Sequence, residues 1–203
     1  MSAKAKETVL VDGPAGVIEA VVSDPGAERA GVAIIAHPHP LYGGTLDNKV
    51  VQTLAKAFES IGYMAVRFNF RGVGDSAGEF DEGRGELKDL LAVAAHVRSR
   101  IPGSGLVLAG FSFGASIAAA AAEGLNPEKL VLIAPPVEGF PIGEVAPGTL
   151  VVHGEEDDVA PLADVLAWAR PQQLPVVVFP GTGHFFHGML VPLRDLVMRY
   201  CRN

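Results

Sequence analysis

The sequence predicts an α/β fold in which a mostly parallel central sheet is flanked by helices on both faces. Short continuous apolar runs, which a strand buried on both faces requires, alternate along the chain with segments of helical period. The chain has 203 residues, 49% of them hydrophobic, which is enough for a sizeable core. We therefore expect a single domain over residues 1–203.

The N-terminal part predicts a β-hairpin and then a buried strand. β-rich runs at 8–11 and 17–22 flank a turn sequence at 12–16, DGPAG. Residues 32–36 (VAIIA) form a continuous apolar run, typical of a central parallel strand. This run leads into the loop sequence HPHPLYGG at 37–44.

The rest of the chain continues the alternation of helix and strand. Apolar residues at helical spacing predict helices over 47–61 and 86–101, with a strand over 63–70 between them. The remaining expected elements are a strand at 106–109, a helix at 115–122, strands at 129–134 and 149–152, a helix at 161–169, a strand at 175–179 and a helix at 184–201. Because such an alternation builds a parallel sheet, functional groups are expected on the loops at the carboxyl ends of its strands.

The most informative stretch is 105–122, GLVLAGFSFGASIAAAAA, which predicts a strand, a sharp turn and a helix. Gly110, Ser112 and Gly114 fit the G-x-S-x-G pattern of a nucleophile elbow. A serine on so tight a turn has strained backbone geometry, and the flanking glycines come too close to carry side chains. A chance match, a membrane span and a phosphate loop compete with this interpretation. The glycines and serines argue against a span, and the stretch lacks a Walker or G-x-G-x-x-G pattern.

Composition excludes some partners. The net charge is −7 and no basic cluster stands out, so we expect neither nucleic acid nor a membrane as a partner. The single cysteine, Cys201, cannot form an internal disulfide, and the N-terminus has no apolar run of signal-peptide length. We expect a cytoplasmic protein.

Four loops carry a resemblance to a known family: HPHPLYGG, NFRGVGDSAG, GFSFG, and HGEEDDVAP followed by GTGHFF. Over nearly its whole length the chain resembles the α/β-hydrolase superfamily, and within it the small lidless bacterial esterase-like serine hydrolases of dienelactone-hydrolase-like size. The resemblance implies an α/β-hydrolase fold with an N-terminal β-hairpin and no cap domain. It also implies the order serine, acid, histidine, and a structural, bracing role for NFRGVGDSAG.

Ser112 needs a base, because its hydroxyl is a weak nucleophile at neutral pH. His184, on the loop after the strand at 175–179, matches the position of the family's catalytic histidine. His187 is the reserve candidate and is expected in the final helix. His96 is expected to be a packed or solvated helix residue, and His153 to have a structural role in its turn.

The base in turn needs an orienting acid. The family pattern places its aspartate four residues before a proline, which here is Asp157. Asp158 is the close alternative, or caps the helix that begins at Pro161. Glu138 is a third candidate, since some members place the acid after the preceding strand.

An oxyanion hole needs two N–H donors. The resemblance assigns one to the amide of Phe113, directly after the nucleophile. The resemblance places the second donor in HPHPLYGG, whose two prolines are excluded because they have no N–H; alignment with the family implies His39, with Leu41 as the alternative. His37 and His39 also allow a metal pair, although metal sites usually need more ligands.

The stretch between 134 and 149 is too short for a helical cap, so the site should be open. We expect it to be shaped by apolar side chains: Leu41, Tyr42, Phe113, Phe140, Phe185 and Phe186. These observations predict a serine-dependent carboxylesterase that cleaves short to medium acyl esters of small molecules without a metal or organic cofactor. A thioesterase or peptidase with the same triad, a non-catalytic binding protein on the same fold, and a homodimer all stay open.

Overall fold

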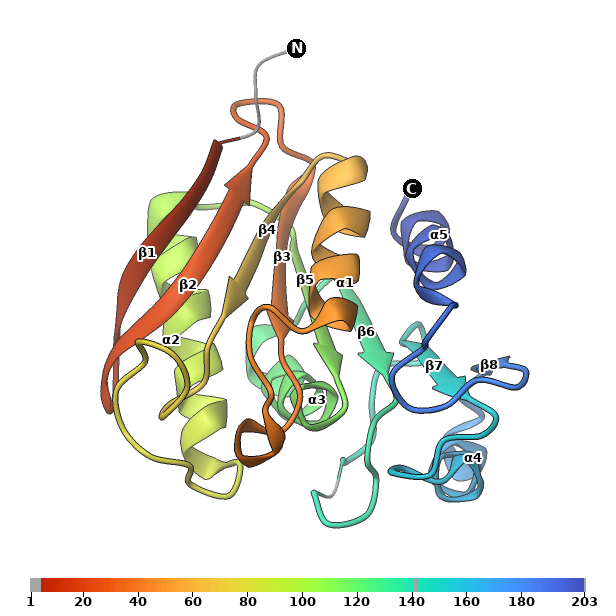
Figure 1. Cartoon of the computed structure of the whole chain (residues 1–203). Helices are drawn as coiled ribbons and strands as arrows, with labels where there is room; N and C mark the ends of the chain where they lie inside the picture. Colours follow the sequence, from red (N-terminus) through yellow and green to blue (C-terminus); the bar gives the residue numbers. More distant parts are fainter. Residues whose placement is uncertain (1–4, 141, 203) are drawn as a thin grey trace.

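The computed structural model describes residues 5–140 and 142–202, and its central feature is one twisted sheet (Figure 1). Its strands are β1 (Ala5–Gly13), β2 (Gly16–Asp24), β3 (Gly31–Ala36), β4 (Tyr63–Phe68), β5 (Leu106–Phe111), β6 (Lys129–Ile133), β7 (Leu150–Gly154) and β8 (Val176–Phe179). Within the described residues their order is β1-β2-β4-β3-β5-β6-β7-β8. The pairs β1–β2 and β2–β4 are antiparallel, and every other pair is parallel. The predicted fold class, including the N-terminal hairpin, is confirmed.

Helices cover both faces of this sheet. They are α1 (Lys49–Ser60), α2 (Arg84–Arg100), α3 (Phe113–Leu125), α4 (Leu162–Ala169) and α5 (Leu190–Cys201), with short 3₁₀ turns η1 (Pro40–Tyr42) and η2 (Arg170–Gln172). Leu90 of α2, Ile117 of α3 and Val165 of α4 belong to one core cluster, whereas Leu54 of α1 and Val197 of α5 belong to the other. None of the described helices is long and apolar enough to cross a membrane.

Strand β5 is a continuous apolar run because both of its faces are buried. Leu106 and Leu108 pack into the cluster under α2 and α3, and Val107, Ala109 and Phe111 pack into the cluster under α1. Successive side chains of a strand point to opposite faces, so a central strand covered on both sides has no position left for a polar residue.

Two helix boundaries differ from the sequence-based prediction. The last helix begins at Leu190 rather than at His184, because Phe186 and Gly188 have φ angles of +53° and +76°, which a right-handed helix does not allow. His187 therefore lies in a loop and not in the helix. Helix α4 has Pro161 as its N-cap residue with no side-chain cap bond, so Asp158 does not cap it.

The connection from β6 to β7 leaves the carboxyl edge of the sheet uncovered. Its described residues, 134–140 and 142–149, contain no helix or strand. The prediction that no cap domain is inserted here agrees with this connection.

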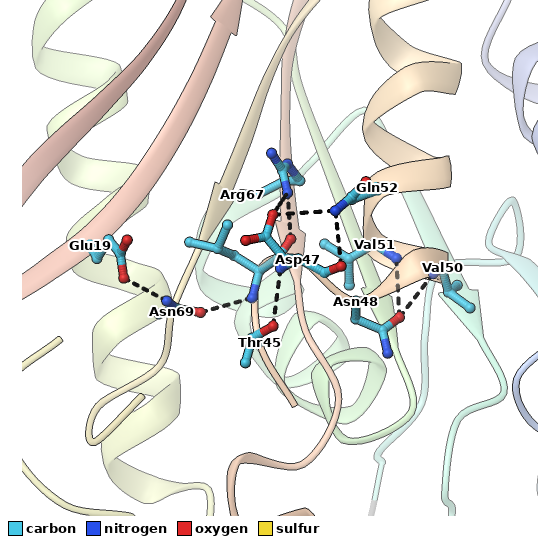
Figure 2. A network of polar contacts seen from close by, with 10 residues as sticks. Glu19, Thr45, Asp47, Asn48, Val50, Val51, Gln52, Arg67 and Asn69 are labelled. Atoms are coloured by element: carbon cyan, nitrogen blue, oxygen red, sulfur yellow. Dashed lines mark hydrogen bonds and ion pairs between the residues drawn. The ribbon is translucent and has the colours of Figure 1, made fainter. Parts of the chain in front are cut away.

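A network of polar contacts fixes the loop that follows β3 (Figure 2). The buried guanidinium of Arg67 on β4 donates to the carbonyl oxygen of Leu46 at 2.6 Å and to the Asp47 carboxylate at 3.0 Å. Asn69 accepts from the Leu46 N–H at 2.8 Å and donates to the Glu19 carboxylate of β2 at 2.7 Å. The loop is thus tied to two strands of the sheet.

Candidate active site

Ser112 lies between β5 and α3, at the carboxyl end of the central strands. Its φ and ψ are +53° and −125°, a strained combination for a residue with a side chain. A Cβ on Gly110 would lie 2.1 Å from the carbonyl oxygen of Gly114, and a Cβ on Gly114 would lie 2.4 Å from that of Ala36. The turn therefore requires glycine two residues before and two residues after the serine.

Replacing Gly110 with alanine should lower the free energy of unfolding by about 3 kcal/mol or more, because backbone atoms with little freedom to move occupy the space. Urea unfolding would measure the loss. Gly124→Ala is the matched control, since an added Cβ there has no neighbour within 4 Å and alanine favours the helix; it should gain up to ~1 kcal/mol. Equal stability of the two variants would contradict this explanation of the G-x-S-x-G spacing.

The structure brings Ser112, His184 and Asp157 into one hydrogen-bonded chain. Ser112 Oγ is 3.0 Å from His184 Nε2, and His184 Nδ1 is 2.8 Å from Asp157 Oδ2. Because an ionised carboxylate only accepts, Nδ1 carries the proton and donates, which leaves Nε2 to accept from the serine hydroxyl. All three residues are buried, with exposed fractions of 7% or less. This is the arrangement in which a histidine can remove a serine proton.

The environment of Asp157 keeps it ionised. Burial on its own would raise the pKa of this carboxyl group, but the hydrogen bonds from His184 and from the Ala160 N–H outweigh burial and hold the pKa below its usual value. The other carboxylate oxygen accepts from the N–H groups of Val159 and Ala160 at 3.0 and 2.8 Å. An anion held in this way can orient an imidazole and stabilise its protonated form.

The alternative acids and the alternative base are not part of this hydrogen-bonded chain. Asp158 and Glu138 are exposed, and the Nδ1 atom of His184 is paired with Asp157. His187 is exposed beside the ring of Phe185, with ring centroids 5.9 Å apart.

The two residues whose backbone N–H groups are expected to bind an oxyanion both line the cleft that contains Ser112. Phe113 is the first residue of α3, where N–H groups have no acceptor within the helix. His39, in the loop after β3, lines the same cleft as Ser112. The N–H of Leu41 donates to His39 Nδ1 at 3.2 Å, which favours His39 over Leu41 as the second donor.

His37 is part of the framework and not a metal ligand. Its ring is fully buried; Nε2 accepts from the Phe70 N–H at 3.0 Å, and Nδ1 donates to the Pro38 carbonyl oxygen at 2.6 Å. With both ring nitrogens engaged, His37 cannot form the metal pair with His39. Within the part of the chain that the structure describes, no three His, Cys, Asp or Glu side chains are grouped to hold a metal ion.

The buried His37 should make the protein less stable in mild acid. Burial lowers its pKa from 6.5 to about 4, so the unfolded chain binds the proton first as the pH falls. Stability is then lost between about pH 6.5 and 4, by roughly 3 kcal/mol. Urea unfolding from pH 7 to 4 should show this loss in the wild type and a smaller loss in His37→Gln. Equal losses in the two proteins would contradict the prediction.

A cleft of about 440 Å³ opens over Ser112, and its lining is largely apolar with several aromatic rings. Of the side chains expected to shape it, four line it: Tyr42, Phe113, Phe140 and Phe185. The ring of His39 packs against those of Tyr42, Phe113 and Phe140, with centroids 4.6, 5.1 and 5.7 Å apart.

Two predicted pocket residues do not line this cleft. Leu41 is 67% exposed and borders a separate depression beside Arg71 and Phe80. Phe186 is fully buried in the core cluster under α1 and α5. Sequence reasoning missed Val159, Asn48 and the other small residues of the lining, which carry no chemical signature of their own.

The NFRGVGDSAG loop does not contribute to the described lining of the cleft. Arg71 donates to both oxygens of the buried Asp89 on α2, at 3.0 and 2.8 Å, and to the Gly85 carbonyl oxygen at 2.9 Å. Ser76 donates to the Asn69 carbonyl oxygen at 2.7 Å. These contacts are those of a bracing element.

Comparison with known proteins finds close likenesses. A family model described as serine aminopeptidase, S33, matches residues 41–145. The chain is 44% identical to an α/β serine hydrolase homologue from Coxiella burnetii, with all of both chains covered and a TM-score of 0.91. It is 39% identical to an α/β serine hydrolase without lid from Xanthomonas campestris, covering 98% of this chain and 95% of that one, also with a TM-score of 0.91. An uncharacterized protein of Rickettsia prowazekii is 36% identical over 167 residues, which are 77% of this chain and 69% of that protein.

Proposed function

The chain belongs to the lidless α/β serine hydrolases, and from this premise we propose that it hydrolyses carboxylic esters with short to medium acyl chains. The observation that carries the proposal is the hydrogen-bonded chain from Ser112 through His184 to Asp157, which opens into an aromatic cleft.

In the proposed reaction His184 Nε2 takes the proton of Ser112 as its Oγ attacks the ester carbonyl carbon. The N–H groups of Phe113 and His39 stabilise the negative oxygen of the tetrahedral intermediate. Asp157 stabilises the imidazolium, which then protonates the departing alcohol. Water, deprotonated by the same histidine, releases the acid from the acyl-enzyme.

The charge of the cleft supports an uncharged substrate. Its described lining contains no lysine or arginine, and its carboxylate, Glu138, lies at the exposed edge. The whole chain has a net charge of −7. A coenzyme A thioester carries several phosphate charges, which this cleft does not neutralise and which the chain as a whole repels. We therefore favour neutral esters over such thioesters.

Peptide hydrolysis is the second candidate, because the matched family model is described as a serine aminopeptidase. The match ends at residue 145, before the acid and the base. Glu138 is the cleft residue that could pair with the ammonium group of a peptide N-terminus.

A fluorophosphonate probe and three substrates test the proposal. The probe should form an adduct on Ser112, located by peptide mass spectrometry and lost in His184→Ala. p-Nitrophenyl butyrate should be hydrolysed faster than butyryl-coenzyme A or alanine p-nitroanilide. Faster cleavage of the anilide would favour the peptidase, and no adduct on folded protein would favour a binding protein.

A further inference from the structure

A second histidine lies behind the acid. His153, at the end of β7, has a fully buried ring. Its Nε2 atom is 2.6 Å from the carbonyl oxygen of Ala160 and 3.4 Å from Asp157 Oδ2. The N–H of Ala160 in turn donates to Asp157 Oδ1 at 2.8 Å. His153 is therefore linked to the acid through the turn that holds it, and its Nε2 atom also lies near the Asp157 carboxylate.

The neighbours of His153 determine where its proton lies. Both groups near Nε2, the Ala160 carbonyl and the Asp157 carboxylate, accept hydrogen bonds, so Nε2 carries the proton. The buried Nδ1 atom has no hydrogen-bond partner among the described residues. A second proton on Nδ1 would thus be both desolvated and unpaired, and burial lowers the pKa of this imidazole. His153 is a neutral donor with a fixed tautomer.

We propose that His153 is a positioning residue: its Nε2–H, bonded to the Ala160 carbonyl, fixes the turn whose Val159 and Ala160 N–H groups hold Asp157, and it thereby sets the basicity of His184. The inference rests on the proposed function, since it requires that His184 act as the base for Ser112. It differs from a purely structural role in the turn, because it ties a buried histidine away from the cleft to the protonation of the catalytic one.

Removing this hydrogen-bond donor should shift the pH dependence of kcat/KM in a direction that can be predicted. Without the N–H, the turn holds the Val159 and Ala160 N–H groups less firmly against Asp157, so the carboxylate concentrates its charge on His184 Nδ1–H and favours the protonated imidazole. Hydrolysis needs neutral His184, so the acid limb of the kcat/KM profile should move to higher pH. The other titratable groups in or beside the cleft are unchanged in the variants: His39, Glu138 and His187.

Two substitutions at His153 distinguish the loss of its hydrogen-bond donor from the loss of its side-chain volume. His153→Met fills the space without an N–H, whereas the amide of His153→Gln can place an N–H near the position of Nε2. For p-nitrophenyl butyrate we expect kcat to fall about fivefold in His153→Met with KM changed less than about twofold. Its acid limb should shift up by roughly half a unit, and His153→Gln should restore both. An unshifted limb in folded His153→Met would overturn the proposal.

The wild-type protein provides a test that does not depend on the variants folding. In ¹⁵N NMR spectra, His153 should show a protonated Nε2 and an unprotonated Nδ1 from pH 5 to 8; the opposite tautomer would overturn the proposal. Failure of the proposed function looks different. In that case the wild type neither hydrolyses the ester nor forms the fluorophosphonate adduct at Ser112.

Discussion

Ser112→Ala should lower kcat for ester hydrolysis by about 10⁴-fold or more, since no other group can form the acyl-enzyme. The melting temperature should stay unchanged or rise. The serine holds φ at +53° and buries a hydroxyl that is hydrogen-bonded to His184, so its geometry serves catalysis rather than stability. Steady-state kinetics and calorimetry would measure the two effects.

Ser112→Gly is the matched variant for the backbone. Glycine adopts a positive φ without steric cost, so this variant should be as inactive as Ser112→Ala and more stable by about 1 kcal/mol. A large loss of stability in both variants would instead make Ser112 a structural residue.

The fold could be predicted because burial on both sides of a central sheet leaves a clear pattern. β5 and β3 are apolar at every position, and the structure buries every residue of both. The start of the last helix could not be predicted from apolar spacing alone. It depends on the positive φ of Phe186, which a phenylalanine rarely adopts and which tertiary contacts impose here.

The three polar site residues could be placed because each follows a strand at the same edge of the sheet. Ser112 follows β5, Asp157 follows β7 and His184 follows β8, and the loops are short enough to restrict their reach. Figure 1 shows β5, β6, β7 and β8 following one another across this part of the sheet. Parallel strands that end together bring such residues within contact distance.

The pocket was harder to predict, because which way a loop side chain points is decided by local turns. Leu41 and Tyr42 both lie in the 3₁₀ turn η1 and are both exposed, yet Tyr42 borders the cleft and Leu41 borders a separate depression. Phe185 lines the cleft and Phe186 enters the core, although the two are adjacent in the sequence. Phe185 and Phe186 have the same side chain, so hydrophobicity carries no information about which of them points into the cleft.

Asp157→Asn should lower kcat by about 10³- to 10⁴-fold, with KM little changed. An asparagine can turn its NH₂ group toward His184 Nδ1, which then accepts, so the ring proton moves to Nε2. That nitrogen can no longer accept the proton of Ser112. Asp158→Asn is the neighbouring control. Because the Asp158 carboxylate is exposed, removing its charge should lower kcat by less than about twofold.

Acid stability gives Asp157 a second readout, independent of catalysis. Its pKa is lowered in the folded state, so ionised Asp157 stabilises the fold above the pKa of the unfolded chain, and this contribution is lost as the pH falls through the folded value. Asp157→Asn cannot titrate, so its unfolding free energy should fall less than that of the wild type below about pH 4. If Asp158→Asn costs more activity than Asp157→Asn, the acid of the site is Asp158, and the 2.8 Å contact between His184 and Asp157 is structural.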